Sequence, residues 1–171
     1  MGELEQIGRY QLLARLATGG MAEIHLARQT GIGGFEKIVV VKRILPHLAK
    51  EKAFVEMFLD EAVIAARLNH PNVVQIYDLG ESDGSYYIAM EYLEGESLGH
   101  LVSEGYRLDK PMSPALTAGV MAQVCDGLHY AHTLDDEQGR PMGIVHRDIS
   151  PHNVIVLFSG VAKLVDFGIA K

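Results

Sequence analysis

The chain has 171 residues, 48% hydrophobic and 22% charged, which is the composition of an ordinary globular domain with a sizeable core. The formal net charge of −7 argues against a nucleic-acid-binding surface, and no apolar run is long enough to span a bilayer. The single cysteine, Cys125, cannot form an internal disulfide and no signal-peptide pattern opens the chain, so the sequence predicts a cytoplasmic location.

Two strand-like segments and a glycine turn open the chain. Residues 10–17 and 22–28 carry apolar side chains in strand-like alternation, and Gly19 and Gly20 lie between them. A glycine turn lets backbone N–H groups approach a phosphate closely, although for two glycines alone an ordinary hairpin turn is the default interpretation. We interpret a second glycine cluster at residues 31–34 as the connection to the next strand.

A lysine and a glutamate in the next two segments predict an ion pair. Residues 38–42 form a β-branched run that ends in Lys42, and strand alternation puts this lysine on the face of Val40 and Ile38. The following segment predicts an amphipathic helix, and Glu61 falls inside its apolar stripe. The stripe consists of Phe54, Met57, Phe58, Ala65 and Leu68. A core-facing carboxylate is costly unless it is paired, so we expect Glu61 to bind Lys42, the alternative being an exposed position at the margin of the stripe.

The middle of the chain alternates strand and helix signals. The expected elements are strands over residues 73–79 and 86–90, a turn over 81–85, a short helix over 97–104 and a long helix over 114–132. Ser113 and Pro114 are a favourable N-cap and first-turn pair for the long helix. Its apolar face consists of Leu116, Val120, Val124, Leu128 and Ala131.

Near the C-terminus the sequence predicts a tight hairpin. Two apolar runs, 154–158 and 161–165, flank Ser159-Gly160, which suggests a two-residue turn. In that register Asn153 lies directly opposite Asp166.

This register would gather oxygen ligands at the open end of the hairpin. Asn153 and Asp166 would lie side by side, with Asp148 five residues upstream of Asn153 in the preceding loop. Carboxylate and amide oxygens suit Mg²⁺, which completes its octahedron with phosphates and water. Taken singly, Asn and Asp at such positions more often cap strand ends.

The combination His146-Arg147-Asp148…Asn153 followed by Asp166-Phe167-Gly168 resembles the signature set of the protein kinase family. The wording Gly-Gly-Met-Ala-Glu at residues 19–23 is similar to its bacterial, eukaryotic-like serine/threonine branch. The resemblance covers nearly all of residues 10–171. It implies an α+β fold with a five-stranded antiparallel N-lobe sheet and one main helix (about 10–90), a hinge (91–95) and an incomplete, mainly helical C-lobe (96–171).

The resemblance also implies ATP as phosphate donor, Mg²⁺ as metal and a role for each matching residue. Asp148 would orient the substrate hydroxyl and accept its proton, while Asn153 and Asp166 would hold Mg²⁺. Lys42 would fix the α- and β-phosphates and would itself be fixed by Glu61. The remaining nucleotide contacts would come from Gly19 and Gly20 over the phosphates, Ile24, Val40 and Ile155 around the adenine, Met90 at the back pocket, and the backbone of Glu91 and Leu93 at the adenine edge.

Three features depart from the family pattern. Ala17 and Ala22 stand where the glycine-rich loop has its first and third glycines, and Ser150 stands where the serine/threonine branch has a lysine. The sequence ends at Lys171, before the activation segment and the remaining helices of the larger lobe. We therefore expect impaired activity in this fragment and an exposed apolar face on the helix at 114–132, which a partner or a missing C-terminal region would cover.

Three functions are consistent with the sequence. The first is an ATP-dependent protein serine/threonine kinase, whose protein substrate the sequence does not identify. The second is a non-catalytic nucleotide-binding module, a pseudokinase that kept the ATP-site residues. The third, a small-molecule phosphotransferase of kinase-like fold, is disfavoured because the full H-R-D and D-F-G set resembles that of protein kinases.

Overall fold

The structure is a computed structural model that describes residues 5–167, so Gly168 of the Asp-Phe-Gly motif lies outside the described residues. The described chain divides into two compact units. The first contains the residues up to Ala66 together with Gln75–Tyr92, and the second contains Arg67–Val74 together with the residues from Leu93 onward.

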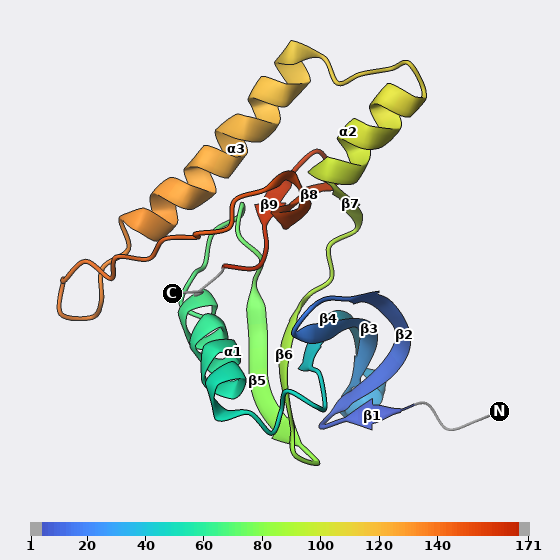
Figure 1. Cartoon of the computed structure of the whole chain (residues 1–171), viewed down its shortest axis with the longest axis vertical. Coiled ribbons are helices and arrows are strands. Elements are labelled where there is room, and N and C mark those ends of the chain that lie inside the picture. The colour runs from blue at the N-terminus through green and yellow to red at the C-terminus, as the bar shows by residue number, and fades with distance from the viewer. Residues whose placement is uncertain (1–4, 168–171) are drawn as a thin grey trace. The chain divides into compact units, whose positions relative to one another are not determined.

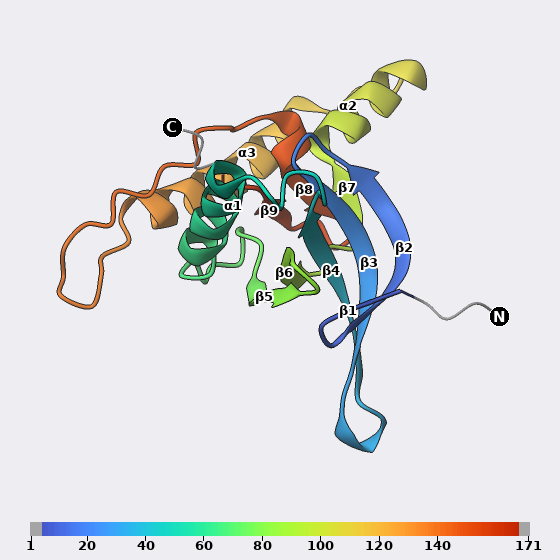
Figure 2. The ribbon, with the colours of Figure 1, turned by 60° about the horizontal axis from the view of Figure 1, so that its bottom comes forward.

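The first unit is an antiparallel sheet with one helix (Figure 1). Its elements are β1 (Gln6–Ile7), β2 (Tyr10–Thr18), β3 (Ala22–Thr30), β4 (Glu36–Ile44), α1 (Lys52–Ala65), β5 (Ile76–Ser82) and β6 (Ser85–Glu91). The strand order is β1-β2-β3-β4-β6-β5, and Figure 2 shows β2, β3 and β4 side by side. The predicted fold class is confirmed, but the predicted count of five strands is wrong because the short β1 pairs with the start of β2.

The two faces of this sheet have different roles. One face is packed into a core that consists of Ile7, Tyr10, Leu12, Ala27, Val39, Val41, Tyr87 and Ala89. On the other face Ile24 lies opposite Lys42 across β3 and β4, and Val40 lies opposite Met90 across β4 and β6. The alternation of β4 therefore puts Lys42 on the face of Val40, as predicted.

Two boundaries in this unit differ from the sequence-based expectation. The strand predicted over 73–79 begins only at Ile76, because Val74 donates its N–H to the Leu164 carbonyl in the second unit at 2.9 Å. The turn between β5 and β6 is shorter than predicted, since Asp83 and Gly84 alone make it with positive φ angles of 51° and 73°. Residues 31–34 connect β3 to β4, as predicted.

The second unit contains a small antiparallel sheet and two helices (Figure 1). Its elements are β7 (Gly95–Ser97), α2 (Leu98–Arg107), α3 (Pro114–His132), a 3₁₀ turn (Pro151–Asn153), β8 (Val154–Leu157) and β9 (Ala162–Leu164). Ser97 and Ser113 cap α2 and α3, because their hydroxyl oxygens accept the N–H groups of His100 and Leu116. None of the described helices combines the length and apolar character that a membrane crossing requires.

The apolar face of α3 is largely covered. Val120, Val124 and Ala131 are at most 2% exposed, because α3 packs against β9. The prediction of an exposed apolar face is therefore wrong for these residues. It is correct for Leu116, which is 55% exposed, and Met121 is 42% exposed on the same helix.

Candidate active site

The lysine and the glutamate of the first unit form the predicted ion pair. Lys42 on β4 donates from Nζ to Oε1 of Glu61 on α1 at 2.6 Å. The two side chains are only 12% and 19% exposed, so the pair is mostly shielded from water. A short charge-assisted bond in such a place fixes the lysine ammonium in one position on the sheet face.

Other predicted site residues of the first unit lie around this lysine. Ile24, Val40 and Met90 share its face of the sheet, which is an apolar surface beside a fixed positive charge. Gly19 and Gly20 form the turn between β2 and β3, and the Gly19 N–H donates to the Ala22 carbonyl at 2.8 Å. A side chain at Gly20 would meet no atom within 4 Å, so this turn is open on its outer side.

The two expected adenine-edge residues, Glu91 and Leu93, lie on either side of Tyr92, the last residue of the first unit before the chain continues into the second. Glu91 ends β6, and its carboxylate accepts the backbone N–H of Gln75 at 2.7 Å while its own N–H donates to the Gln75 carbonyl. Leu93 begins the longer of the two segments that make up the second unit. In the second unit Ile155 on β8 lies opposite Ser97 and Lys163, so these three residues share one face of the small sheet.

Asp148 and Asn153 are held together in the loop before β8. The Asn153 amide Nδ2 donates to the Asp148 carboxylate oxygen Oδ2 at 2.9 Å and to the Asp148 backbone carbonyl at 2.9 Å. Both bonds use the nitrogen of the amide, which leaves its oxygen suited to a metal ion. Asp148 itself is exposed.

The hairpin that follows has a different register from the predicted one. Val154 pairs with Leu164 and Ile155 with Lys163, so every pairing is shifted by one residue. The connecting loop has three residues instead of two, with Gly160 at a φ of 88°. The Gly160 N–H donates to the Leu157 carbonyl at 2.8 Å. A glycine in this left-handed position is typical of three-residue hairpin loops.

The shifted register changes the surroundings of Asp166. The residue bonded across from Asn153 is Val165, whose N–H donates to the Asn153 carbonyl at 3.0 Å. The prediction that Asp166 lies directly opposite Asn153 is therefore wrong. Asp166 follows the ladder and has a positive φ of 55°, which turns the chain at this residue.

His146 connects the two acidic segments of the second unit. It is 1% exposed, and its Nε2 lies 3.0 Å from the Val165 carbonyl. The Asp148 N–H donates to Nδ1 at 3.4 Å, which requires Nε2 to carry the proton that bonds Val165. Burial lowers the pKa of His146, consistent with a neutral imidazole. This histidine ties the residue before Asp166 to the backbone of Asp148.

Two residues of this region have a strained backbone. Arg147 and Asp166 adopt positive φ angles of 64° and 55°, in the left-handed region that non-glycine residues rarely occupy. Such conformations persist where the surrounding contacts impose them, and they concentrate at functional sites. Here Arg147 directly precedes Asp148 and Asp166 follows the hairpin, which supports a functional role for both segments.

Two further residues of the second unit support this site but were missed by the sequence analysis. Asn72 and Gln123 hydrogen-bond to β9, the strand that leads to Asp166. Neither belongs to a recognisable motif, and 39 residues separate Gln123 from its strand partner Ala162. No signal in the sequence indicates this contact.

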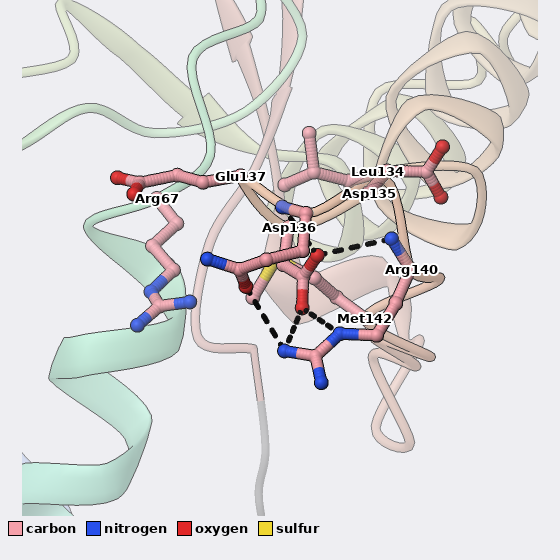
Figure 3. A pocket seen from close by; sticks show the side chains of 8 residues that line it. Arg67, Leu134, Asp135, Asp136, Glu137, Arg140 and Met142 are labelled. Carbon is pink, nitrogen blue, oxygen red and sulfur yellow. Dashed lines mark hydrogen bonds and ion pairs between the residues drawn. The ribbon is translucent and has the colours of Figure 1, made fainter.

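A separate pocket of about 630 Å³ lies at the loop between α3 and His146 (Figure 3). Asp136 organises this loop, since its carboxylate accepts the backbone N–H and the guanidinium of Arg140. These bonds lower the pKa of Asp136. The lining residues are Arg67, Leu134, Asp135, Asp136, Glu137, Gln138, Arg140 and Met142, none of which is a predicted site residue.

A sheet that fixes a Lys–Glu pair, together with a loop that holds Asp148 and Asn153 ahead of a hairpin ending in Asp166, defines a kinase-type phosphotransfer fold. The chain matches the protein kinase domain family over residues 10–171 and belongs to this family.

Individual relatives agree with this assignment. The chain is 48% identical to the tyrosine-protein kinase MasK of Myxococcus xanthus over 98% of its own length, and 38% identical to the serine/threonine-protein kinase PrkC of Bacillus subtilis over 95%. It covers only 26% and 23% of these two relatives. The crystal structure of the Mycobacterium tuberculosis PknI kinase domain matches all of this chain with a TM-score of 0.74 and 28% identity, and the chain covers 64% of that structure.

Proposed function

We propose that this chain is the ATP-binding part of a protein kinase that transfers the γ-phosphate of ATP to a protein hydroxyl group with the help of Mg²⁺. The observation that carries the proposal is the Asp148 carboxylate, held at 2.9 Å by the Asn153 amide and exposed to substrate. A carboxylate fixed in this way can orient a hydroxyl group and accept its proton.

The second unit provides the residues that act on the reacting groups. Asn153 holds Asp148 through its nitrogen and offers its oxygen to Mg²⁺, for which Asp166 is the second ligand. Bound Mg²⁺ would neutralise charge on the phosphates. Both ligands supply oxygen, the donor that Mg²⁺ prefers, so the residues fit this ion.

The first unit provides the residues that hold the nucleotide. Lys42, kept in place by Glu61, binds the α- and β-phosphates, and the backbone of Gly19 and Gly20 covers them. The shared sheet face of Lys42 and its apolar neighbours supports this assignment. We assign the remaining adenine contacts to Ile24, Val40, Met90, the backbone of Glu91 and Leu93, and Ile155.

For the accepting residue we propose serine or threonine, as in the relatives named serine/threonine-protein kinases. Tyrosine is the second candidate, because the relative at 48% identity is named a tyrosine-protein kinase. In addition, this chain has Ser150 two residues after Asp148, where the serine/threonine branch has a lysine, and this difference weakens the assignment to serine or threonine. Phosphoamino-acid analysis of the phosphorylated products distinguishes the two.

The central test compares the wild-type chain with Asp148→Asn. We expect the wild type to bind Mg–ATP but to transfer labelled phosphate to peptides only slowly, and we expect Asp148→Asn to lose at least about 100-fold of this transfer with little change in nucleotide affinity. Asp126→Asn, at an exposed position on α3, is the matched control and should change neither quantity. Nucleotide binding without any transfer would favour the pseudokinase, and turnover that survives in Asp148→Asn would contradict the proposed base.

Two proposals concern the surroundings of the chain. We propose a cytoplasmic location, where ATP is abundant, and a signalling role through phosphorylation. We also propose that a partner or a further segment of a longer chain covers Leu116 and Met121 on α3. Replacing both residues with lysine should improve the solubility of this chain, which sedimentation after concentration measures.

A further inference from the structure

The second edge of β9, the strand that leads to Asp166, bonds to a loop and to side chains instead of to another strand. One edge of β9 pairs with β8. On its other edge the Leu164 N–H donates to the Asn72 carbonyl at 2.9 Å, and the Leu164 carbonyl accepts the Val74 N–H at 2.9 Å. The backbone of residues 72–74 thus takes the place of a neighbouring strand for the end of β9.

At the start of β9, side chains bond to the backbone N–H and carbonyl groups of the same edge. Gln123 on α3 accepts the Ala162 N–H through Oε1 at 2.9 Å and donates from Nε2 to the Gly160 carbonyl at 3.2 Å. Asn72, which is 8% exposed, donates from Nδ2 to the Ala162 carbonyl at 2.8 Å and to Gln123 Oε1 at 3.2 Å. The amide of Gln123 therefore acts as the peptide group of a missing strand.

We propose that Gln123, together with Asn72, is a positioning residue for the metal ligand Asp166. The step from contact to function is short, because Asp166 comes two residues after the end of β9 and Val165 between them is bonded to Asn153. A strand fixed on both edges presents the next residue in one direction, whereas an unpaired edge lets it move. This inference rests on the proposed function, in which Asp166 binds Mg²⁺.

Two substitutions separate the two ends of the Gln123 amide. Gln123→Leu removes both the acceptor oxygen and the donor nitrogen of the amide. It leaves the N–H of Ala162, a residue only 1% exposed, without its acceptor. Gln123→Glu keeps an acceptor for Ala162 but loses the donor to Gly160. We therefore expect the leucine variant to have the larger effect and the glutamate variant to retain part of the function.

The test measures the affinity of the chain for ADP with and without Mg²⁺. We expect Gln123→Leu to bind Mg–ADP about tenfold more weakly than the wild type and to bind metal-free ADP unchanged, because only the metal-bound form uses Asp166. Gln138→Leu, an exposed glutamine of the same unit, is the control and should bind both forms normally.

Hydrogen exchange provides a second readout that does not depend on the nucleotide. In Gln123→Leu the amide of Ala162 should exchange about tenfold faster, while that of Lys163, which lies opposite Ile155 of β8, should keep its rate.

Equal affinities in the wild type and Gln123→Leu would overturn the inference, and so would an equal loss for both forms of ADP, which indicates general destabilisation. If the wild type itself fails to bind Mg–ADP, the proposed function fails first and this inference falls with it.

Discussion

The ammonium nitrogen of Lys42 lies 2.6 Å from Oε1 of Glu61, a residue 19 positions further along the chain. The bond joins the central strand β4 to α1, and it holds a positive charge on the apolar face of the sheet. Because both side chains are largely buried, the pair matters for stability as well as for the proposed phosphate binding.

Breaking this pair should reveal a strong coupling. We expect Lys42→Met and Glu61→Leu each to lower the free energy of unfolding by about 1–3 kcal/mol, because each leaves a partly buried charge without this partner. The double variant should lose less than the sum of the two, by about 1 kcal/mol or more. Urea denaturation of the four proteins measures the coupling.

The exposed pair of Lys52 and Glu56 provides the control for this experiment. Lys52 Nζ lies 3.4 Å from Glu56 Oε1, but the two side chains are 89% and 61% exposed. The coupling energy between these two residues should therefore stay below about 0.5 kcal/mol. Additive losses at Lys42 and Glu61 would contradict the strong coupling.

Substitution of Asn153 should affect metal binding and the proposed base together. Asn153→Ala removes the two bonds to Asp148 and one proposed Mg²⁺ ligand, so we expect at least about tenfold weaker binding of Mg–ADP and slower phosphate transfer. Titration calorimetry measures the first quantity. Asn69→Ala is the control, because Asn69 is bonded to Tyr130 through its backbone N–H. Normal Mg–ADP binding by Asn153→Ala would exclude Asn153 as a ligand.

The buried imidazole of His146 predicts a pH dependence of stability. Its pKa is lowered from the ordinary 6.5 by burial, so between the lowered value and 6.5 the unfolded chain binds a proton that the folded chain does not. Its contribution to stability is therefore fully present above pH 6.5 and is lost as the pH falls through this window. Urea denaturation at about pH 5.5 and about pH 7.5 measures the loss.

The variant His146→Tyr isolates this contribution, because tyrosine does not titrate in this range. The other histidines contribute equally to both proteins, so the wild type should lose more stability on acidification than the variant. An identical pH dependence in the two proteins would show that His146 does not titrate differently in the folded and unfolded states.

Two glycines on α3 should respond oppositely to alanine. A Cβ atom at Gly127 would lie 2.9 Å from the Asn72 carbonyl oxygen, so Gly127→Ala should destabilise the chain by about 1–3 kcal/mol through displacement of residues 72–74. A Cβ atom at Gly119 would meet nothing within 4 Å, so Gly119→Ala should stabilise by up to about 1 kcal/mol through helix propensity. Thermal unfolding compares the two. Stabilisation by Gly127→Ala would refute the close approach of α3 to residues 72–74.

The sequence by itself determined the elements that depend on local signals. Alternation placed Lys42 on the face of Val40, and the helical period placed Glu61 in an apolar stripe, where burial of a carboxylate required a partner. Ser113 marked the start of α3 because capping is chemistry between close neighbours. The family signature at residues 146–153 and 166–168 identified the class of protein.

The tertiary structure decided what depends on distant contacts. The loop of the last hairpin includes Phe158 as a third residue and holds Gly160 in a left-handed conformation. The pairing therefore shifts by one residue, and the partner of Asn153 is Val165 instead of Asp166. The strand predicted over 73–79 begins only at Ile76, because the backbone of Val74 is bonded to Leu164. The side-chain amide of Gln123 bonds to the edge of β9, where a neighbouring strand would otherwise lie. Backbone groups at a strand edge accept any partner of suitable geometry, so the chain packing selects this partner and the sequence pattern does not indicate it.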